Sequence, residues 1–105
     1  MRDNNIAMAY TLVKLAATSA ALCLDGSPGA FYIQKSATGS SQWQLFAEGG
    51  GWCWDAAECA QRATTDLGSS LNYSAVSNNP GEVGGITSSD CSINPTFCSF
   101  NKVYM

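Results

Sequence analysis

The stretch that decides the fold is LFAEGGGWC at residues 45–53, where three glycines follow an apolar run. The run from Trp43 to Ala47 predicts a buried strand, which the glycines end abruptly. Glycine permits φ > 0 and leaves neighbouring backbone N–H groups uncovered. A strand that leads through such groups into a helix start makes a concave anion site, where N–H groups can hold the oxyanion of an attacked ester. The alternative is a tight strand-to-helix turn in which glycine only relieves crowding.

A helix is predicted directly after this loop. Asp55 is a good N-cap, Glu58 follows three residues later as in a capping box, and Gly68 occupies the expected C′ position. Cys53 and Cys59 are close enough in sequence to form a disulfide at the start of the helix. Such a disulfide would make the backbone behind the glycines rigid, as a preorganised site requires. The predicted helix carries a thin apolar stripe of Ala56, Ala57, Ala60, Ala63 and Leu67.

A hairpin is predicted before the glycines. Residues 24–29 (LDGSPG) predict a turn, because they are dense in residues that set φ or bond their own backbone. Residues 30–35 have strong β-propensity and predict a strand. A second turn at residues 36–41 would let this strand pair with the one at residues 42–47.

The first 24 residues are rich in alanine, and we expect them to belong to the folded domain, with residues 1–9 as a disordered or truncated leader. The alternative is a secretory signal, with Arg2 near its start and small residues around Ala20. Lys14 interrupts the apolar centre that such a signal needs.

The stretch from residue 68 to 95 lacks periodicity and predicts a long loop, which in a compact domain is usually functional or disordered. It contains a glycosylation sequon at Asn72. Cys91 and Cys98 are candidates for a second disulfide across the end of this loop. Residues 100–105 predict a final strand.

Composition excludes several classes of function. The five lysines and arginines do not cluster and the net charge is −3, which argues against binding to nucleic acid. No uncharged apolar stretch reaches about 18 residues, so membrane insertion is not expected. Histidine is absent and the cysteine spacings match no common zinc pattern, so we expect no metal site. Five cysteines favour disulfides in an oxidising compartment and leave one thiol unpaired.

Ser-His-Asp chemistry cannot run in this chain alone. The sequence has no histidine and no Gly-x-Ser-x-Gly nucleophile elbow. We therefore expect no esterase activity from these 105 residues by themselves.

From Leu12 to Met105 the chain resembles the pectinacetylesterase and Notum family of carboxylic ester hydrolases. The matching motifs are ALCLDGS at 21–27, the strand at 43–46 with EGGGWC at 48–53, and then Cys59, Arg62, LGSS at 67–70, Asn94-Pro95 and NKV at 101–103. Three consecutive glycines before the tryptophan are typical of the pectinacetylesterase branch.

The resemblance implies an α/β class, with the first strands, the glycine-rich oxyanion loop and one following helix of an α/β-hydrolase-like fold. Residues 1–105 would be the incomplete N-terminal part of one catalytic domain, contributing to a mostly parallel sheet. By position, Gly50 and Gly51 supply the oxyanion-hole N–H groups, and Trp52 is a binding residue. The catalytic serine, aspartate and histidine would lie downstream, as would the partner of Cys23.

The parent enzyme implied by this resemblance is a secreted or cell-wall monomer that deacetylates pectin-type polysaccharide esters without a cofactor. The rival interpretation is a small secreted, disulfide-stapled binding module without catalysis. Its recognition surface would be the polar loop from Asn72 to Asp90.

Overall fold

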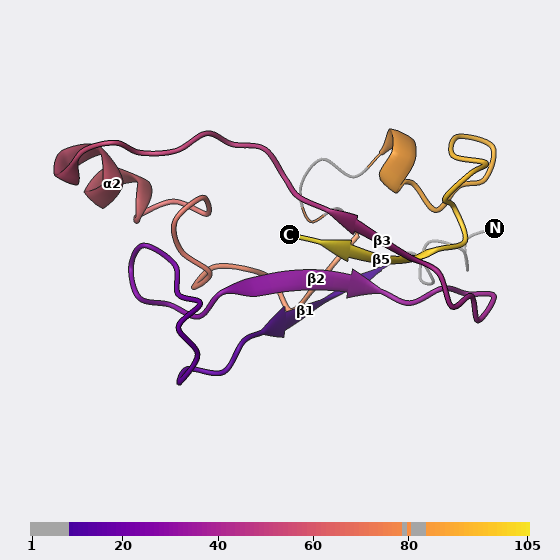
Figure 1. The fold of residues 1–105 in the computed structure, drawn as a ribbon, viewed down its shortest axis with the longest axis horizontal. Helices are drawn as coiled ribbons and strands as arrows, with labels where there is room; N and C mark the ends of the chain where they lie inside the picture. The colour runs from indigo at the N-terminus through magenta and orange to yellow at the C-terminus, as the bar shows by residue number, and fades with distance from the viewer. Residues whose placement is uncertain (1–8, 79, 81–83) are drawn as a thin grey trace.

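The structure is a computed structural model that describes residues 9–78, 80 and 84–105 (Figure 1). Its described strands form one mixed sheet in the order β3-β5-β2-β1-β4. The predicted leader at residues 1–9 lies outside the described residues except for Ala9. No helix in the described ranges is long and apolar enough to cross a membrane. The elements are β1 (Tyr10–Lys14), β2 (Ala30–Gln34), β3 (Trp43–Phe46), α2 (Ala56–Arg62), β4 (Val76–Ser77), the 3-10 helix η1 (Gly85–Thr87) and β5 (Asn101–Tyr104).

The strands predicted before the glycines are confirmed, but β3 is not buried as predicted, because Trp43 and Leu45 are 46% and 67% exposed. The predicted hairpin is also wrong. Strand β5 lies between β2 and β3, antiparallel to β2 and parallel to β3 (Figure 1). The connection at residues 36–41 therefore crosses over the end of β5 instead of making a tight turn. Turn residues show only where the chain changes direction. Which strands lie next to each other depends on contacts between residues that are distant in sequence.

The side chain of Asn101, at the start of β5, is what holds this crossing in place. Its Nδ2 donates to the carbonyls of Ser40 (2.7 Å) and Gln42 (2.9 Å), and its Oδ1 accepts from the N–H of Ser36 (2.8 Å). Asn101 is only 5% exposed, so these bonds satisfy a side chain that water does not reach freely.

The sheet is not mostly parallel in the described part of the chain, contrary to expectation. Strand β1 pairs antiparallel with β2 and β4, and β2 pairs antiparallel with β5, so β3 and β5 are the only neighbouring strands of the described sheet that pair in parallel. Strand β1 was not predicted, because the alanine-rich segment around it hides its short run of β-branched and aromatic residues.

Tyrosines rather than aliphatic residues form the buried core. Tyr10, Tyr32 and Tyr104 are buried together, and Leu12, Phe46 and Tyr73 pack against them. The hydroxyl of Tyr32 donates to Ser74 O at 2.7 Å, and that of Tyr10 donates to Thr87 O at 3.4 Å. These bonds attach the long segment after Gly68 to the sheet, and that segment carries β4 and η1 where the sequence predicted only a loop.

Helix α2 is shorter than predicted, because it ends at Arg62 and not near Gly68. The hydroxyls of Thr64 and Thr65 donate to the carbonyls of Gln61 and Arg62. These side-chain bonds compete for carbonyls that further helical turns would use. Gly68 is still required for another reason. A Cβ added there would lie 2.4 Å from the Arg62 carbonyl oxygen.

The predicted Cys91–Cys98 disulfide is confirmed, with Cα atoms 5.1 Å apart. Lys102 holds this segment against β5, since its Nζ donates to the carbonyls of Phe97, Cys98 and Phe100 at 3.0–3.1 Å. The residue is 2% exposed, and burial lowers the pKa of its ammonium group.

Replacing Asn101 should destabilise the chain more than its size suggests. In Asn101→Ala, the Ser36 N–H and the Ser40 carbonyl lose this partner in a half-buried place, and the Gln42 carbonyl keeps only the bond from the backbone N–H of residue 101, so we expect unfolding free energy to fall by about 2 kcal/mol. Urea denaturation measures this loss. The matched control is Asn72→Ala at an exposed position, which should change stability by about 0.5 kcal/mol or less. Equal losses in the two variants would show that the Asn101 side chain does not hold the crossing.

Alkaline pH should weaken the core through Tyr10. Burial, and to a lesser degree the nearby Tyr104, raise the pKa of Tyr10 to about 12. The folded state keeps this phenol neutral, so its contribution is complete below pH 10 and is lost as pH rises towards 12. At about 1.4 kcal/mol per pH unit, the loss reaches roughly 2–3 kcal/mol.

Urea denaturation between pH 9 and pH 12 should therefore show a smaller decline for Tyr10→Phe than for the parent. The lowered pKa of Lys102 acts in the opposite direction, but it is common to both proteins and cancels in the comparison. A Cys23→Ser background prevents thiol exchange at high pH. Parallel declines in the two proteins would contradict the assignment to Tyr10.

Candidate functional site

The glycine loop leaves the sheet at the edge where β3 and β5 both end. Because these two strands are parallel, their carboxyl ends meet, and the N–H of Glu48 donates to the carbonyl of Met105 at 2.8 Å. From there the chain runs past the end of the sheet to α2 (Figure 1). In open α/β sheets, ligands bind in the crevice outside the carboxyl ends of the strands. The loop is therefore in the position that a binding site of this fold class occupies.

The start of α2 has the predicted N-cap, but among the described contacts the Glu58 side chain does not complete a capping box. The Asp55 side chain accepts from the Glu58 N–H at 2.7 Å, which confirms the N-cap. The predicted Cys53–Cys59 disulfide is also present, with Cα atoms 5.1 Å apart. The residue that follows the glycines and Trp52 is thus covalently attached to the second turn of the helix.

Arg62 binds the glycine loop from the other end of α2. Its Nη2 donates to the carbonyl oxygens of Gly50 (2.9 Å) and Gly51 (3.3 Å). Gly51 has a φ of 87°, in the left-handed region that favours glycine, and the N–H groups of Gly50 and Gly51 have no acceptor among the described residues. The loop therefore directs carbonyls towards the helix and leaves backbone donors free.

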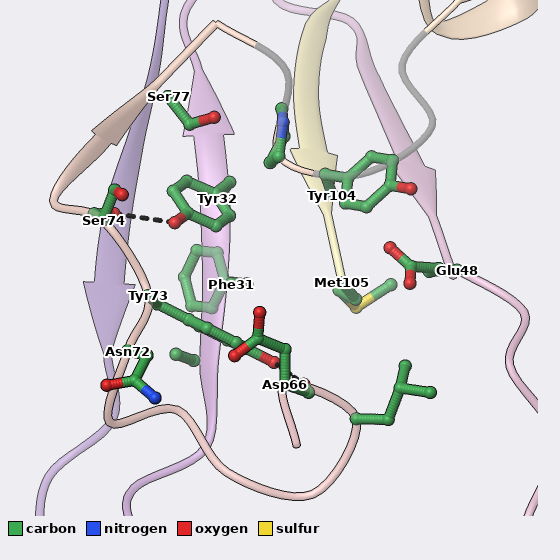
Figure 2. A pocket seen from close by; sticks show the side chains of 13 residues that line it. Phe31, Tyr32, Glu48, Asp66, Asn72, Tyr73, Ser74, Ser77, Tyr104 and Met105 are labelled. Atoms are coloured by element: carbon green, nitrogen blue, oxygen red, sulfur yellow. Dashed lines mark hydrogen bonds between the residues drawn. The ribbon is translucent and has the colours of Figure 1, made fainter.

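Two adjoining cavities lie beside the loop, at the carboxyl edge of the sheet. One, of about 230 Å³, is lined by the three glycines and Arg62. The other, of about 250 Å³, extends below the sheet edge towards Tyr32 (Figure 2). Residues that line both are Glu48, Asp66, Leu67, Tyr73 and Met105.

The side chains shared by these cavities are acidic and aromatic. Figure 2 shows Glu48 reaching towards Met105, with Asp66 close to the ring of Tyr73. The Tyr73 hydroxyl donates to the backbone carbonyl of Asp66 at 2.7 Å. Burial raises the pKa of Tyr73, and charges on Cys23, Asp66 and Glu48 add to the rise.

Two sequence motifs that are distant in the chain, the Asp25–Ser27 turn and the Ser69–Ser70 pair, are joined by hydrogen bonds. The Asp25 carboxylate accepts from the N–H (2.9 Å) and hydroxyl (2.5 Å) of Ser27, and bonds from Ser27 and Ser69 lower the pKa of Asp25. The Ser27 hydroxyl in turn accepts from the N–H of Ser70 at 3.0 Å, and Ser70 Oγ donates to Pro28 O at 2.7 Å. This network holds the backbone next to Gly68, which packs against Arg62.

Trp52 and Cys23 lie at the margins of the site. Trp52 is 77% exposed and is not among the described residues that line the 230 Å³ cavity, and Trp54 is 71% exposed. Cys23 is the free cysteine, as expected, and its Sγ donates to Pro28 O at 3.5 Å. Within the described ranges, no group of three His, Cys, Asp or Glu side chains is placed to hold a metal ion.

Sequence reasoning did not assign a role to Arg62 or Asp66. Arg62 was noticed only as part of a matching motif, although an arginine in the last turn of the helix that follows a glycine loop can reach back to its carbonyls. Asp66 gave no signal, because it lies after the true end of α2 in a segment that was predicted to be helical.

Comparison with known proteins gives a consistent result. The sequence profile described as Pectinacetylesterase matches residues 1–105. Pectin acetylesterase 5 of Arabidopsis thaliana is 44% identical over 110 residues, which cover 97% of this chain and 24% of that protein. The palmitoleoyl-protein carboxylesterase NOTUM of Schmidtea mediterranea is 35% identical over 99 residues, which cover 91% of this chain and 18% of that protein.

The fold agrees with a solved structure as well. The Wnt deacylase Notum from Drosophila superposes with a TM-score of 0.76 at 29% identity, covering 92% of this chain and 27% of that one. The strands, glycine loop and α2 are therefore part of an α/β-hydrolase-like fold, and the chain spans about a quarter of the length of pectin acetylesterase 5. The chain belongs to the pectinacetylesterase family.

Proposed function

We propose that this chain supplies the oxyanion loop of a carboxylic ester hydrolase that removes acetyl groups from pectin-type polysaccharide. The observation that carries the proposal is the glycine loop at the carboxyl edge of β3 and β5. Arg62 donates to two carbonyls of this loop, the Cys53–Cys59 disulfide fixes the residue after Trp52, and the three glycines line a cavity of about 230 Å³. By position, Gly50 and Gly51 are the donors.

The proposed reaction is acyl transfer through a serine. The serine oxygen attacks the acetyl carbonyl while a histidine accepts its proton, and the carbonyl oxygen becomes an oxyanion held by the loop. The sugar hydroxyl leaves with that proton, and water then releases acetate from the acetyl-enzyme. Since this chain has no histidine, the triad belongs to the part of the family fold that it does not match.

The substrate class follows from the names of the relatives and from one surface feature. Several relatives are called pectin acetylesterases, so an acetylated polysaccharide is the proposed partner. The exposed ring of Trp52 adjoins the loop and could contact a sugar face. Two disulfides support a secreted or cell-wall location. We propose a monomeric enzyme without a cofactor.

The 105 residues alone should not hydrolyse an activated acetyl ester such as p-nitrophenyl acetate above the rate in buffer. A chimera in which this chain replaces the matching quarter of pectin acetylesterase 5 should hydrolyse it, and a serine-directed inhibitor should abolish the activity. Steady-state kinetics on both proteins decide the matter. Inhibitor-sensitive turnover by the 105 residues would refute the proposal that the triad lies outside this chain. A folded but inactive chimera would favour the binding module.

Two glycines with the same kind of backbone strain separate a catalytic loop from a simple turn. Gly51 and Gly39 have φ values of 87° and 74°, and neither has a heavy atom within 4 Å of an added Cβ. Alanine at either position should therefore cost similar stability, on the order of 1–2 kcal/mol. In the chimera, Gly51→Ala should lower kcat at least about tenfold, because the loop relaxes and its donors move. Gly39→Ala should leave kcat within about twofold. Equal effects on kcat would show that the loop is only a turn.

A further inference from the structure

We propose that Asn72 carries an N-linked glycan, attached where the chain passes from α2 to β4. The inference goes beyond the proposed esterase activity and does not depend on it, although it rests on the proposed secretion of the chain. It starts from the tripeptide Asn72-Tyr73-Ser74, which has the pattern that a glycosyltransferase of the secretory pathway recognises. The two disulfides are typical of the oxidising compartment in which that enzyme acts.

The sequence contains one similar tripeptide, Asn94-Pro95-Thr96, but proline in the middle position prevents recognition. The structure separates the two tripeptides in the same way. The Asn94 side chain is 4% exposed, and its Nδ2 donates to the carbonyls of Ile86 and Ser88 at 2.8 and 3.0 Å. A buried amide nitrogen with two acceptors has no room for a sugar. Asn72 is therefore the candidate acceptor.

The Asn72 amide is free to be modified. The residue is exposed, and its side chain has no hydrogen-bond partner among the described residues. The hydroxyl of Ser74, which the transferase must also recognise, is likewise exposed and has no partner in the described ranges. Neither side chain has to give up a contact of the folded chain to meet the enzyme or to hold a sugar.

Tyr73, the middle residue, anchors the tripeptide to the sheet. Its ring lies 6.3 Å from that of Tyr32, its hydroxyl donates to Asp66 O at 2.7 Å, and its N–H donates to Ser70 O at 3.2 Å. The Tyr32 hydroxyl donates to Ser74 O at 2.7 Å. The backbone of the tripeptide is therefore held in place, while the two side chains that the transferase recognises remain at the surface.

The position of Asn72 is compatible with the proposed role of the glycine loop. Strand β4, which follows the tripeptide, lies at one edge of the described sheet, and β3, which leads into the loop, lies at the other. Asn72 and Glu48 line the same cavity of about 250 Å³, but Figure 2 shows them at opposite ends of it. A glycan at Asn72 therefore begins at the end of this cavity that is remote from Glu48 and the glycines.

The attachment is a glycosyl transfer to the amide nitrogen. The donor is an oligosaccharide whose first sugar is joined through its carbon C1 to a lipid diphosphate. A bond forms between Asn72 Nδ2 and C1 while the bond from C1 to the diphosphate oxygen breaks, and the lipid diphosphate leaves with the electron pair. Nδ2 loses one of its protons to a base, so the product is still an amide and nothing is oxidised or reduced.

A tripeptide that arose by chance and stays unmodified is the competing explanation. The Asn72 amide would then remain a free polar group at the cavity. The two explanations differ in the mass of the secreted chain and in the part played by Ser74. Glycosyl transfer requires the Ser74 hydroxyl, whereas the folded chain makes no described hydrogen bond with it.

The test is expression of the 105-residue chain behind a cleavable secretion signal in a eukaryotic host. The secreted protein should exceed the polypeptide mass by one N-linked oligosaccharide. Peptide-N-glycosidase F should remove this oligosaccharide and convert Asn72 to aspartate, which peptide mapping by mass spectrometry detects. Material retained in the cells is mapped in the same way. A chain that has the mass of the bare polypeptide would overturn the inference.

Ser74→Ala is the decisive variant, because it keeps the Asn72 amide and removes only a hydroxyl that has no described partner. Ser74→Ala and Asn72→Gln should both lose the oligosaccharide completely, and Ser74→Thr should retain it. The matched control is Asn78→Gln, which changes an exposed asparagine outside such a tripeptide and should keep the oligosaccharide. An oligosaccharide that persists in Ser74→Ala or Asn72→Gln would show attachment elsewhere and overturn the assignment.

The same peptide map on a secreted chimera with pectin acetylesterase 5 distinguishes failure of the inference from failure of the proposed function. If the chimera is glycosylated at Asn72 but hydrolyses no p-nitrophenyl acetate, the inference stands and the proposed function fails. If the chimera is active and Asn72 is unmodified, the proposed function stands and the inference is overturned.

Discussion

The arrangement of the sheet depends on the buried side chain of Asn101. Its three hydrogen bonds join the first residue of β5 to the connection between β2 and β3, and so keep these two strands apart with β5 between them. As a result β3 lies parallel to β5, and the segments after both strands leave the sheet at one edge. The glycine loop, Glu48 and the two cavities are all found at that edge. The Asn101 side chain and the pairing of β5 with both strands therefore place the candidate site at that edge.

Features with a local signal were predicted well from the sequence. The strands β2, β3 and β5, the Asp55 cap and both disulfides depend on residues that lie within a few positions of one another. Partner choice within the sheet was predicted wrongly, since it depends on contacts between residues more than 60 positions apart, such as Asn101 with Ser36. An asparagine at the start of an apolar strand is typical of the polar end of that strand. Nothing in the sequence shows that Asn101 is buried.

The candidate site also combines features that the sequence predicted with features that it did not. The glycines were found because a run of three is conspicuous, but the hydrogen bonds that Arg62, the last residue of α2, donates to their carbonyls were not predicted. The threonines that end α2 compete for helix carbonyls, an effect that helix propensities and apolar periodicity do not capture. The Asp25–Ser27 turn and the Ser69–Ser70 pair were both seen as motifs, but only the structure shows that they bind each other.

The central place of β5 has a consequence for synthesis on the ribosome. The strand that joins β3 to the rest of the sheet is made some 55 residues after β3 and lies between partners that appear much earlier. Until residues 101–104 emerge, the backbone groups of β3 that bond to β5 have no partner in this sheet, and Leu45 and Trp43 add apolar surface to that open edge. The nascent chain must therefore pass through a period in which an unpaired strand precedes its glycine loop, and chaperone contacts during translation would be directed to that strand.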